Sequence, residues 1–209
     1  VFSCKKENDD NNNGNSSNCS SYTAIPNTAF EQALIDLGYD DVIDGQVTTI
    51  NIKDITSLDV SNRNIFDLTG IECFSAVSHL ECHDNQLTSL DLTNNTALNF
   101  LYCHNNRLNT INVSQNTALY YLDCHDNRLT SLDLSNNPIS YLKCDYNQLN
   151  CLNLKNGNDT NTYFFIATDN PNLTCIEVDN PTWATQNWTS YVDNGVTFST
   201  NCNYPAGCF

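Results

Sequence analysis

The sequence predicts an α/β solenoid, a fold in which short parallel strands from stacked coils form a continuous sheet. Four eight-residue segments share one pattern and begin at Leu80, Leu101, Leu122 and Leu142, at intervals of 21, 21 and 20 residues. In each segment the first residue is leucine and the third is cysteine, which is the alternation of a strand with one buried face. A fixed period in this range is typical of supersecondary units that stack to bury a shared core.

Each position of the repeat has a structural role. Leu80 and Cys82 point to the same side of a strand, and stacking at about 4.8 Å places such side chains in a common core. A second alternation, at Leu90 and Leu92, predicts a second narrow strand on the opposite side of the coil. An asparagine follows each first strand, where its amide can satisfy backbone groups that the turn leaves unpaired. These asparagines are Asn85, Asn106, Asn127, Asn147 and Asn170.

The complete pattern, L-x-x-L-x-C-x-x-N-x-L-x-x-L-x-L, resembles the 21-residue leucine-rich repeats of bacterial internalin-like surface proteins. The resemblance covers residues 58–178, which would form about six coils. It implies a leucine-rich-repeat solenoid with a parallel sheet. Proteins of this kind are mostly adhesion or interaction modules on cell surfaces, and the resemblance implies a similar role here.

A solenoid exposes its core at both ends, so the flanking segments are expected to cap it. Residues 22–57 contain a capping-box spacing from Thr28 to Glu31, followed by apolar residues at helical spacing, which predicts an amino-terminal helical cap. Residues 179–209 leave the repeat pattern but carry bulky apolar side chains such as Trp183. We expect them to form the carboxy-terminal cap.

Residues 1–21 are expected to be a lipoprotein-like signal remnant and a flexible tether, because most of them are polar and cannot support a core. The initial letters VFSC resemble the end of a bacterial lipoprotein signal. Cys4 is therefore a candidate lipid anchor, which predicts an extracytoplasmic location on the surface of the outer membrane. The alternative is that Cys4 is a disulfide partner or a free thiol. No run approaches the roughly 18 apolar residues of a membrane span, so the anchor would be the only membrane contact.

The 11 cysteines and the lack of methionine favour an oxidising compartment. The cysteines of the repeats are expected to be buried free thiols that act as small hydrophobic residues. They are Cys82, Cys103, Cys124 and Cys144. Metal binding by these thiols is the alternative, but the predicted core offers them no charged neighbours. Among the remaining cysteines we favour a disulfide between Cys175 and Cys202, because it would join the carboxy-terminal cap to the last coil.

The outward side chains of the main sheet are the candidate binding surface. One column holds an aromatic residue in each of four successive coils, and aromatic rings provide large contact area at low entropic cost. The expected partner-binding residues are Phe100, Tyr102, Tyr121, Asp123, Tyr141, Lys143 and Phe164. The alternative is that the rings only cover one another and stabilise the sheet. On the opposite face, the polar column of Asp91, Asn112 and Asp133 is expected to be solvated.

A second outward column contains three histidines, His83, His104 and His125, with Asp123 beside them. Imidazoles stacked at about 4.8 Å could share a borderline metal such as zinc. Duplication of one repeat explains three histidines equally well, without any chemistry. The sequence therefore predicts no cofactor and no metal, and the alternative is a metal held by these histidines with Asp123 and Asp145 beside them.

Charge and repetition exclude several classes of function. The chain has 8 Lys and Arg against 24 Asp and Glu, a net charge of −16 that repels nucleic acid. Residues that repeat along an open sheet do not converge as a nucleophile and base must, so we expect no enzyme. The predicted function is a non-enzymatic interaction or adhesion module on the bacterial surface, with a protein or a glycan as its partner. The alternative is a structural accessory lipoprotein subunit of an outer-membrane protein complex.

Overall fold

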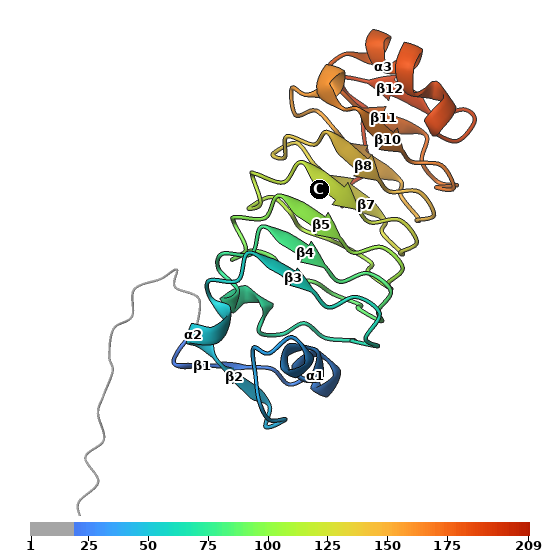
Figure 1. The fold of residues 1–209 in the computed structure, drawn as a ribbon. Coiled ribbons are helices and arrows are strands. Elements are labelled where there is room, and N and C mark those ends of the chain that lie inside the picture. The colour runs from blue at the N-terminus through green and yellow to red at the C-terminus, as the bar shows by residue number, and fades with distance from the viewer. Residues whose placement is uncertain (1–18) are drawn as a thin grey trace, which may run out of the picture.

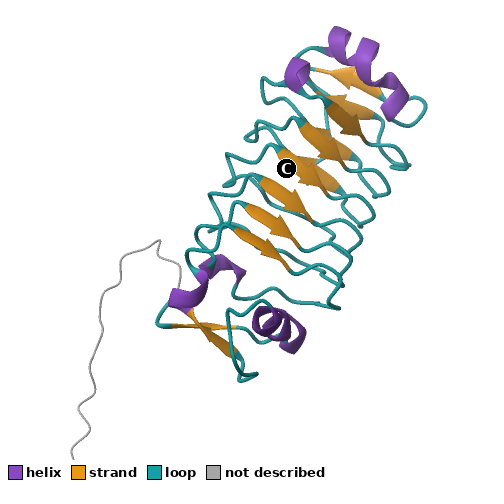
Figure 2. Cartoon of the chain, viewed as in Figure 1, coloured by secondary structure: helices purple, strands orange, loops and turns teal. Residues whose placement is uncertain are grey.

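The computed structural model describes residues 19–209. They form an elongated solenoid in which short strands follow one another along the length and helices cover the two ends (Figure 1, Figure 2). The buried apolar side chains of the coils and of both caps belong to one hydrophobic core. The predicted leucine-rich-repeat solenoid is therefore confirmed.

The main sheet is parallel and has six strands in the order β10-β8-β6-β5-β4-β3. They are β3 (Ser57–Asp59), β4 (His79–Glu81), β5 (Phe100–Tyr102), β6 (Tyr121–Asp123), β8 (Tyr141–Lys143) and β10 (Phe164–Ile166). Leu101 pairs with Leu122, and Leu122 pairs with Leu142, so equivalent positions of successive coils lie side by side. All three leucines are fully buried. The register expected from the repeat is thus confirmed.

A second parallel sheet has the order β12-β11-β9-β7. Its strands are β7 (Ser131–Asp133), β9 (Cys151–Asn153), β11 (Cys175–Glu177) and β12 (Thr197–Ser199). In the two preceding coils this side has only an isolated bridge, between Asp91 and Asn112, so the expectation of a strand in every coil is wrong there. Leu90 and Leu92 are nevertheless buried. Core packing therefore holds this side of the coil even where strand pairing is minimal.

The expected asparagines form a ladder along the first turn of the coils. In Asn127, Nδ2 donates to the carbonyls of Cys103, Cys124 and His125 at 3.0, 3.2 and 3.2 Å. Its Oδ1 accepts a hydrogen bond from the backbone N–H of Leu108 at 3.0 Å. The other ladder asparagines, Asn85, Asn106, Asn147 and Asn170, bond in the same way. Each amide therefore joins its own coil to the preceding one.

A second asparagine ladder, which was not predicted from the sequence, lies at another turn of the coil. Asn116 is fully buried, and its Nδ2 donates to the carbonyls of Leu92 at 3.0 Å and Asn95 at 2.8 Å. Asn137 makes the equivalent bonds one coil later. Asn95 and Asn116 both begin the sequence N-T-A-L, so the repeat did contain a signal for this ladder.

The amino-terminal segment places two helices and a two-stranded antiparallel sheet at the end of the solenoid. Its elements are β1 (Tyr22–Ala24), α1 (Thr28–Asp36), β2 (Gln46–Thr48) and α2 (Thr49–Ile52). The 3₁₀ turn η1 (Ile71–Cys73) comes later, after strand β3 of the main sheet. The residue that caps α1 is Asn27, whose side chain accepts from Phe30 N–H at 3.0 Å. The expected capping box between Thr28 and Glu31 is therefore wrong. Glu31 instead accepts backbone N–H bonds from the turn at Asp44, Gly45 and Gln46.

The carboxy-terminal segment covers the last coil with α3 (Pro181–Trp188) and η3 (Thr189–Tyr191), after the short turn η2 (Asp159–Asn161). Trp188 is buried against the ring of Phe165, with ring centroids 4.5 Å apart. The chain then turns back, and the Tyr204 hydroxyl bonds to the backbone of Leu152 and Glu177. The segment therefore packs on the core and also contributes strand β12 to the second sheet.

Three disulfides link the ends of the described chain to the coils. They join Cys19 to Cys73, Cys151 to Cys208, and Cys175 to Cys202, the last being the pairing that the sequence favours. Cys4, the candidate lipid anchor, lies outside the described residues. Of the helices formed by residues 19–209, none has the length and apolar character to cross a membrane.

Candidate binding surface

Five outward side chains of the main sheet form a surface that we call the aromatic strip: Phe100, Tyr102, Tyr121, Tyr141 and Phe164. Tyr121 and Tyr141 stack with ring centroids 3.9 Å apart and planes 8° apart, and Tyr141 stacks on Phe164 at 4.4 Å. The ring centroids of Tyr102 and Tyr121 are 4.6 Å apart. Burial raises the pKa of Tyr121, and hydrogen bonds with its tyrosine neighbours add to this effect. The strip is therefore one packed layer of rings, of which Phe164 is exposed and the other four are half-buried.

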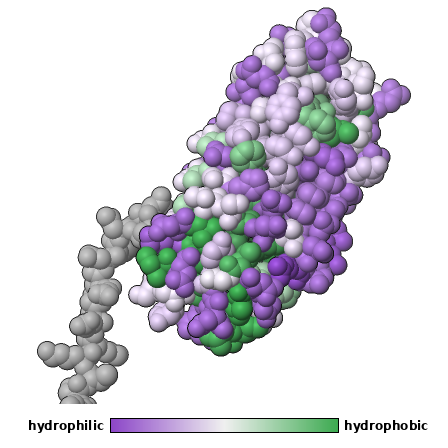
Figure 3. Space-filling view, viewed as in Figure 1, coloured by the Kyte–Doolittle hydropathy of each residue, from purple (hydrophilic) through white to green (hydrophobic). Residues whose placement is uncertain are grey.

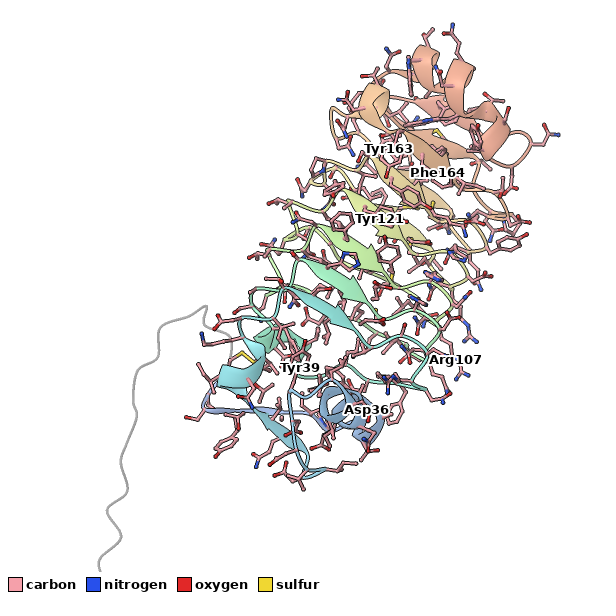
Figure 4. The ribbon with its side chains drawn as sticks, in the orientation of Figure 1. Asp36, Tyr39, Arg107, Tyr121, Tyr163 and Phe164 are labelled. Carbon is pink, nitrogen blue, oxygen red and sulfur yellow. A yellow bond between two sulfur atoms is a disulfide. The ribbon has the colours of Figure 1, made fainter. Side chains whose placement is uncertain are left out.

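The aromatic strip ends at an open cavity of about 290 Å³ between the last coils and the carboxy-terminal cap. Tyr163, Phe164, Trp183 and Tyr191 are among its lining residues, and Asn187 adds a polar amide. Tyr163 is 71% exposed and lies next to Phe164 on the same face as Tyr121 (Figure 4). Neither Tyr163 nor Tyr191 was predicted to be part of the binding surface, although two consecutive aromatic residues before Phe165 were a usable signal for the first of them.

The surface around the strip is mixed in character. In the space-filling view, most of the visible face is hydrophilic or neutral (Figure 3). Hydrophobic residues gather over the amino-terminal segment and in a smaller patch toward the carboxy-terminal coils (Figure 3).

Asp123 and Lys143 occupy the column beside the rings, but only Lys143 is partly exposed. The Asp123 side chain is 10% exposed, because the imidazoles of His104 and His125 lie against it. Nδ1 of His125 is 2.5 Å from Oδ1 of Asp123. Asp123 was expected to contact a partner, yet its carboxylate faces these neighbours and has little free surface.

The three histidines stack beside the strip. Ring centroids are 4.3 Å apart for His83 and His104 and 4.5 Å apart for His104 and His125, with nearly parallel planes. Burial lowers the pKa of His104, while the charge of Asp123 acts in the opposite direction. The structure therefore brings together the whole column that the repeat indicated, with one buried carboxylate within it.

The polar column on the opposite face has a structural role at each position. Asp91, Asn112 and Asp133 each accept a hydrogen bond from the backbone N–H two residues ahead, at 3.0 Å. Asp91 and Asn112 are exposed and Asp133 is half-buried. An oxygen acceptor at these positions therefore stabilises a turn, and aspartate and asparagine supply it equally.

The repeat cysteines form a second internal ladder, and the prediction of buried free thiols is confirmed. The four are Cys82, Cys103, Cys124 and Cys144, all with no exposed surface. Burial raises the pKa of Cys82 to about 12, which leaves it in the unreactive thiol form. They pack as small apolar residues between the leucines of the core.

These thiols should be protected until the solenoid unfolds. In a Cys4→Ser variant, we expect Ellman's reagent to leave the four ladder thiols unmodified in native buffer and to modify all of them in guanidinium chloride. Absorbance of the released thiolate measures both stages. Prompt reaction of a ladder thiol in the native protein would contradict its place in the core.

No model of a known protein family matches the chain. A stretch of 42 residues is 48% identical to internalin J of Listeria monocytogenes and covers 20% of this chain and 5% of that protein. The solved functional domain of InlJ from Listeria monocytogenes, which includes a cysteine ladder, is similar over 77% of this chain and 38% of that domain. The TM-score is 0.63 and the sequence identity is 28%. The chain is a bacterial internalin-like leucine-rich-repeat protein.

A second solved structure supports the same fold. The structure of the internalin InlF of Listeria monocytogenes is similar over 75% of this chain and 52% of the InlF chain. The sequence identity is 18% and the TM-score is 0.57. The internalin-like protein therefore spans about half or less of the relatives that it matches. Like the InlJ domain, it contains a cysteine ladder along its coils.

Proposed function

We propose that the internalin-like protein is a non-enzymatic adhesion or interaction module at the bacterial cell surface, and that the aromatic strip binds its protein or glycan partner. The similarity to internalins supports the general role. The three disulfides support a location outside the cytoplasm, where such bonds persist. Anchoring through an acylated Cys4 is part of the proposal and rests on the sequence alone.

The observation that carries this proposal is that aromatic side chains continue beyond the stacked rings of the aromatic strip. Cross-strand stacking explains why Tyr121 and Tyr141 lie face to face. It does not account for Tyr163, which is 71% exposed, or for the cavity that Tyr163 and Tyr191 line. Exposed aromatic rings beside a concave surface are the usual anchors of an interface.

The double variant Tyr121→Ala/Tyr141→Ala tests whether the aromatic strip binds the partner. We expect it to lower affinity for the partner by about thirtyfold, or about 2 kcal/mol, because buried aromatic anchors contribute most of the energy of an interface. Binding of the labelled full chain to arrays of extracellular proteins and of glycans would identify a partner and measure the loss. A far-UV circular dichroism melt would check that the variant folds.

Two controls make the result specific. Tyr22→Ala/Phe66→Ala removes two exposed rings away from the strip, and should leave binding unchanged. Asp91→Asn/Asp133→Asn removes charge from the opposite face while keeping the oxygen acceptors of the turns. If this last variant loses binding and the tyrosine variant keeps it, the proposed face is wrong. Purification in mild detergent with a membrane protein at fixed ratio would favour an accessory subunit instead.

A further inference from the structure

We infer that His104, Asp123 and His125 form a binding site for a divalent transition-metal cation of the zinc type. Asp123 is the last residue of β6, His125 lies two residues beyond it, and His104 has the equivalent position after β5 in the preceding coil. The repeat therefore supplies the two histidines, and the aspartate occurs where the neighbouring coils have Tyr102 and Lys143. The site goes beyond the proposed function, because the partner surface does not require it.

The separations of the three groups suit a single small cation. One ligand atom from each residue lies within 4.8 Å of the others. The Asp123 carboxylate is 2.5 Å from Nδ1 of His125 through one oxygen and 3.7 Å from Nδ1 of His104 through the other. Ligand atoms around a tetrahedral zinc ion are about 3.3 Å apart, given bonds of about 2.0–2.1 Å. The two distances lie on either side of that value.

An unpaired polar atom faces this carboxylate. Nδ1 of His104 is buried and has no hydrogen-bond partner among residues 19–209. A buried polar group without a partner is destabilising, and coordination to a cation would satisfy it. The rings of His104 and His125 are stacked 14° from parallel, so both must tilt about χ2 for their lone pairs to converge. That torsion is broad for histidine and requires no backbone movement.

The neighbouring group of His83, Asp84 and His104 also lies within reach of one cation, but its carboxylate is less available. Asp84 is exposed and accepts a hydrogen bond at 2.8 Å from Asn105, which lies outside the group. The Asp123 side chain is nine-tenths buried. Its carboxylate is therefore the better ligand, because a partly desolvated charge attracts a cation more strongly.

The chemistry of the three groups points to zinc or a similar ion rather than calcium. Two imidazole nitrogens and one carboxylate oxygen are the ligands of many zinc sites that keep an open coordination position. The net charge of −16 also attracts cations to the molecule. The open position would face outward, on the same side of the sheet as the aromatic strip.

Isothermal titration of the tag-free full chain with zinc chloride tests the site. We expect saturable binding of one ion, and at least a tenfold weaker affinity in both Asp123→Asn and His125→Ala. The matched control His83→Ala/Asp84→Asn disrupts the neighbouring group and should keep the affinity. A one-to-one complex in the unmodified chain should also shift the Nδ1 resonances of His104 and His125 in nitrogen-15 spectra.

Several results would overturn the site. No saturable heat in the unmodified chain would do so, as would zinc-induced shifts confined to His83. Binding that survives Asp123→Asn but is lost in His83→Ala/Asp84→Asn would assign the ion to the other group. Because the spectra use the unmodified chain, they decide the question even where a variant fails to fold. Zinc binding without an effect on partner binding would leave the proposed function unchanged.

Discussion

The variant Asn127→Ala is expected to lower the free energy of unfolding by about 3 kcal/mol or more, a large effect for one amide. Its side chain donates to the carbonyls of Cys103, Cys124 and His125 and accepts from the N–H of Leu108. Alanine would remove all four hydrogen bonds. Each carbonyl would keep one other partner, whereas the buried N–H of Leu108 would have none. The three lost bonds to carbonyls contribute about 0.5–1.5 kcal/mol each, and an unpaired buried N–H costs about 1–3 kcal/mol when no water replaces its bond. Urea unfolding followed by circular dichroism measures the change.

Asn109→Ala is the matched control for this ladder position. Asn109 is exposed, and its side chain makes no hydrogen bond to residues 19–209, so the substitution should alter the free energy of unfolding by less than about 0.5 kcal/mol. Equal effects of the two substitutions would contradict the ladder. They would mean that solvent satisfies the turn and that the amide of Asn127 is dispensable.

The sequence was sufficient to predict the coil register because every core position repeats. Leu101, Cys103 and Asn106 recur one period later as Leu122, Cys124 and Asn127, and a shift by one residue would expose all of these leucines. The same repetition determines which rings stack. Four periods are enough to distinguish a true alternation from chance, so both the core and the outward columns follow from the repeat alone.

Local choices outside the repeat were harder to predict. Asn27 and Thr28 both have side-chain oxygens that can cap a helix, and Glu31 has the spacing of a capping box from Thr28. Asn27 caps α1, since the chain enters the helix one residue earlier. Glu31 is then free to bind the turn at Gly45, which is distant in sequence. No local pattern contains that tertiary contact.

The candidate surface was predicted in position but not in exposure. The repeat placed Asp123 and Tyr121 on the same outward face, yet only the three-dimensional packing shows that two imidazoles cover the carboxylate. Tyr163 was missed because it precedes the strand and lies outside the repeat pattern. Outward direction follows from alternation, whereas exposure depends on the size of the neighbours in adjacent coils.

Removing the Cys19–Cys73 disulfide with a Cys19→Ser/Cys73→Ser variant is expected to destabilise the amino-terminal cap by about 4 kcal/mol. The bond closes a loop with a sequence separation of 54 residues, and the chain-entropy model gives about this value for that length. Cys73 ends η1, which packs under the first coils, so the bond holds β1 and α1 against the core. Urea unfolding measures the total change in the free energy of unfolding, and hydrogen exchange shows which elements are destabilised.

The location of the effect is the sharper test, because a solenoid is stabilised mainly by contacts between neighbouring units. The Cys19→Ser/Cys73→Ser variant should lose amide protection in α1 and the first coils while β9 and β11 stay protected. The matched variant Cys175→Ser/Cys202→Ser should show the reverse, since that bond lies at the other end of the solenoid. If both variants lose protection in the same elements, the two caps are not independent and the disulfides act on the chain as a whole.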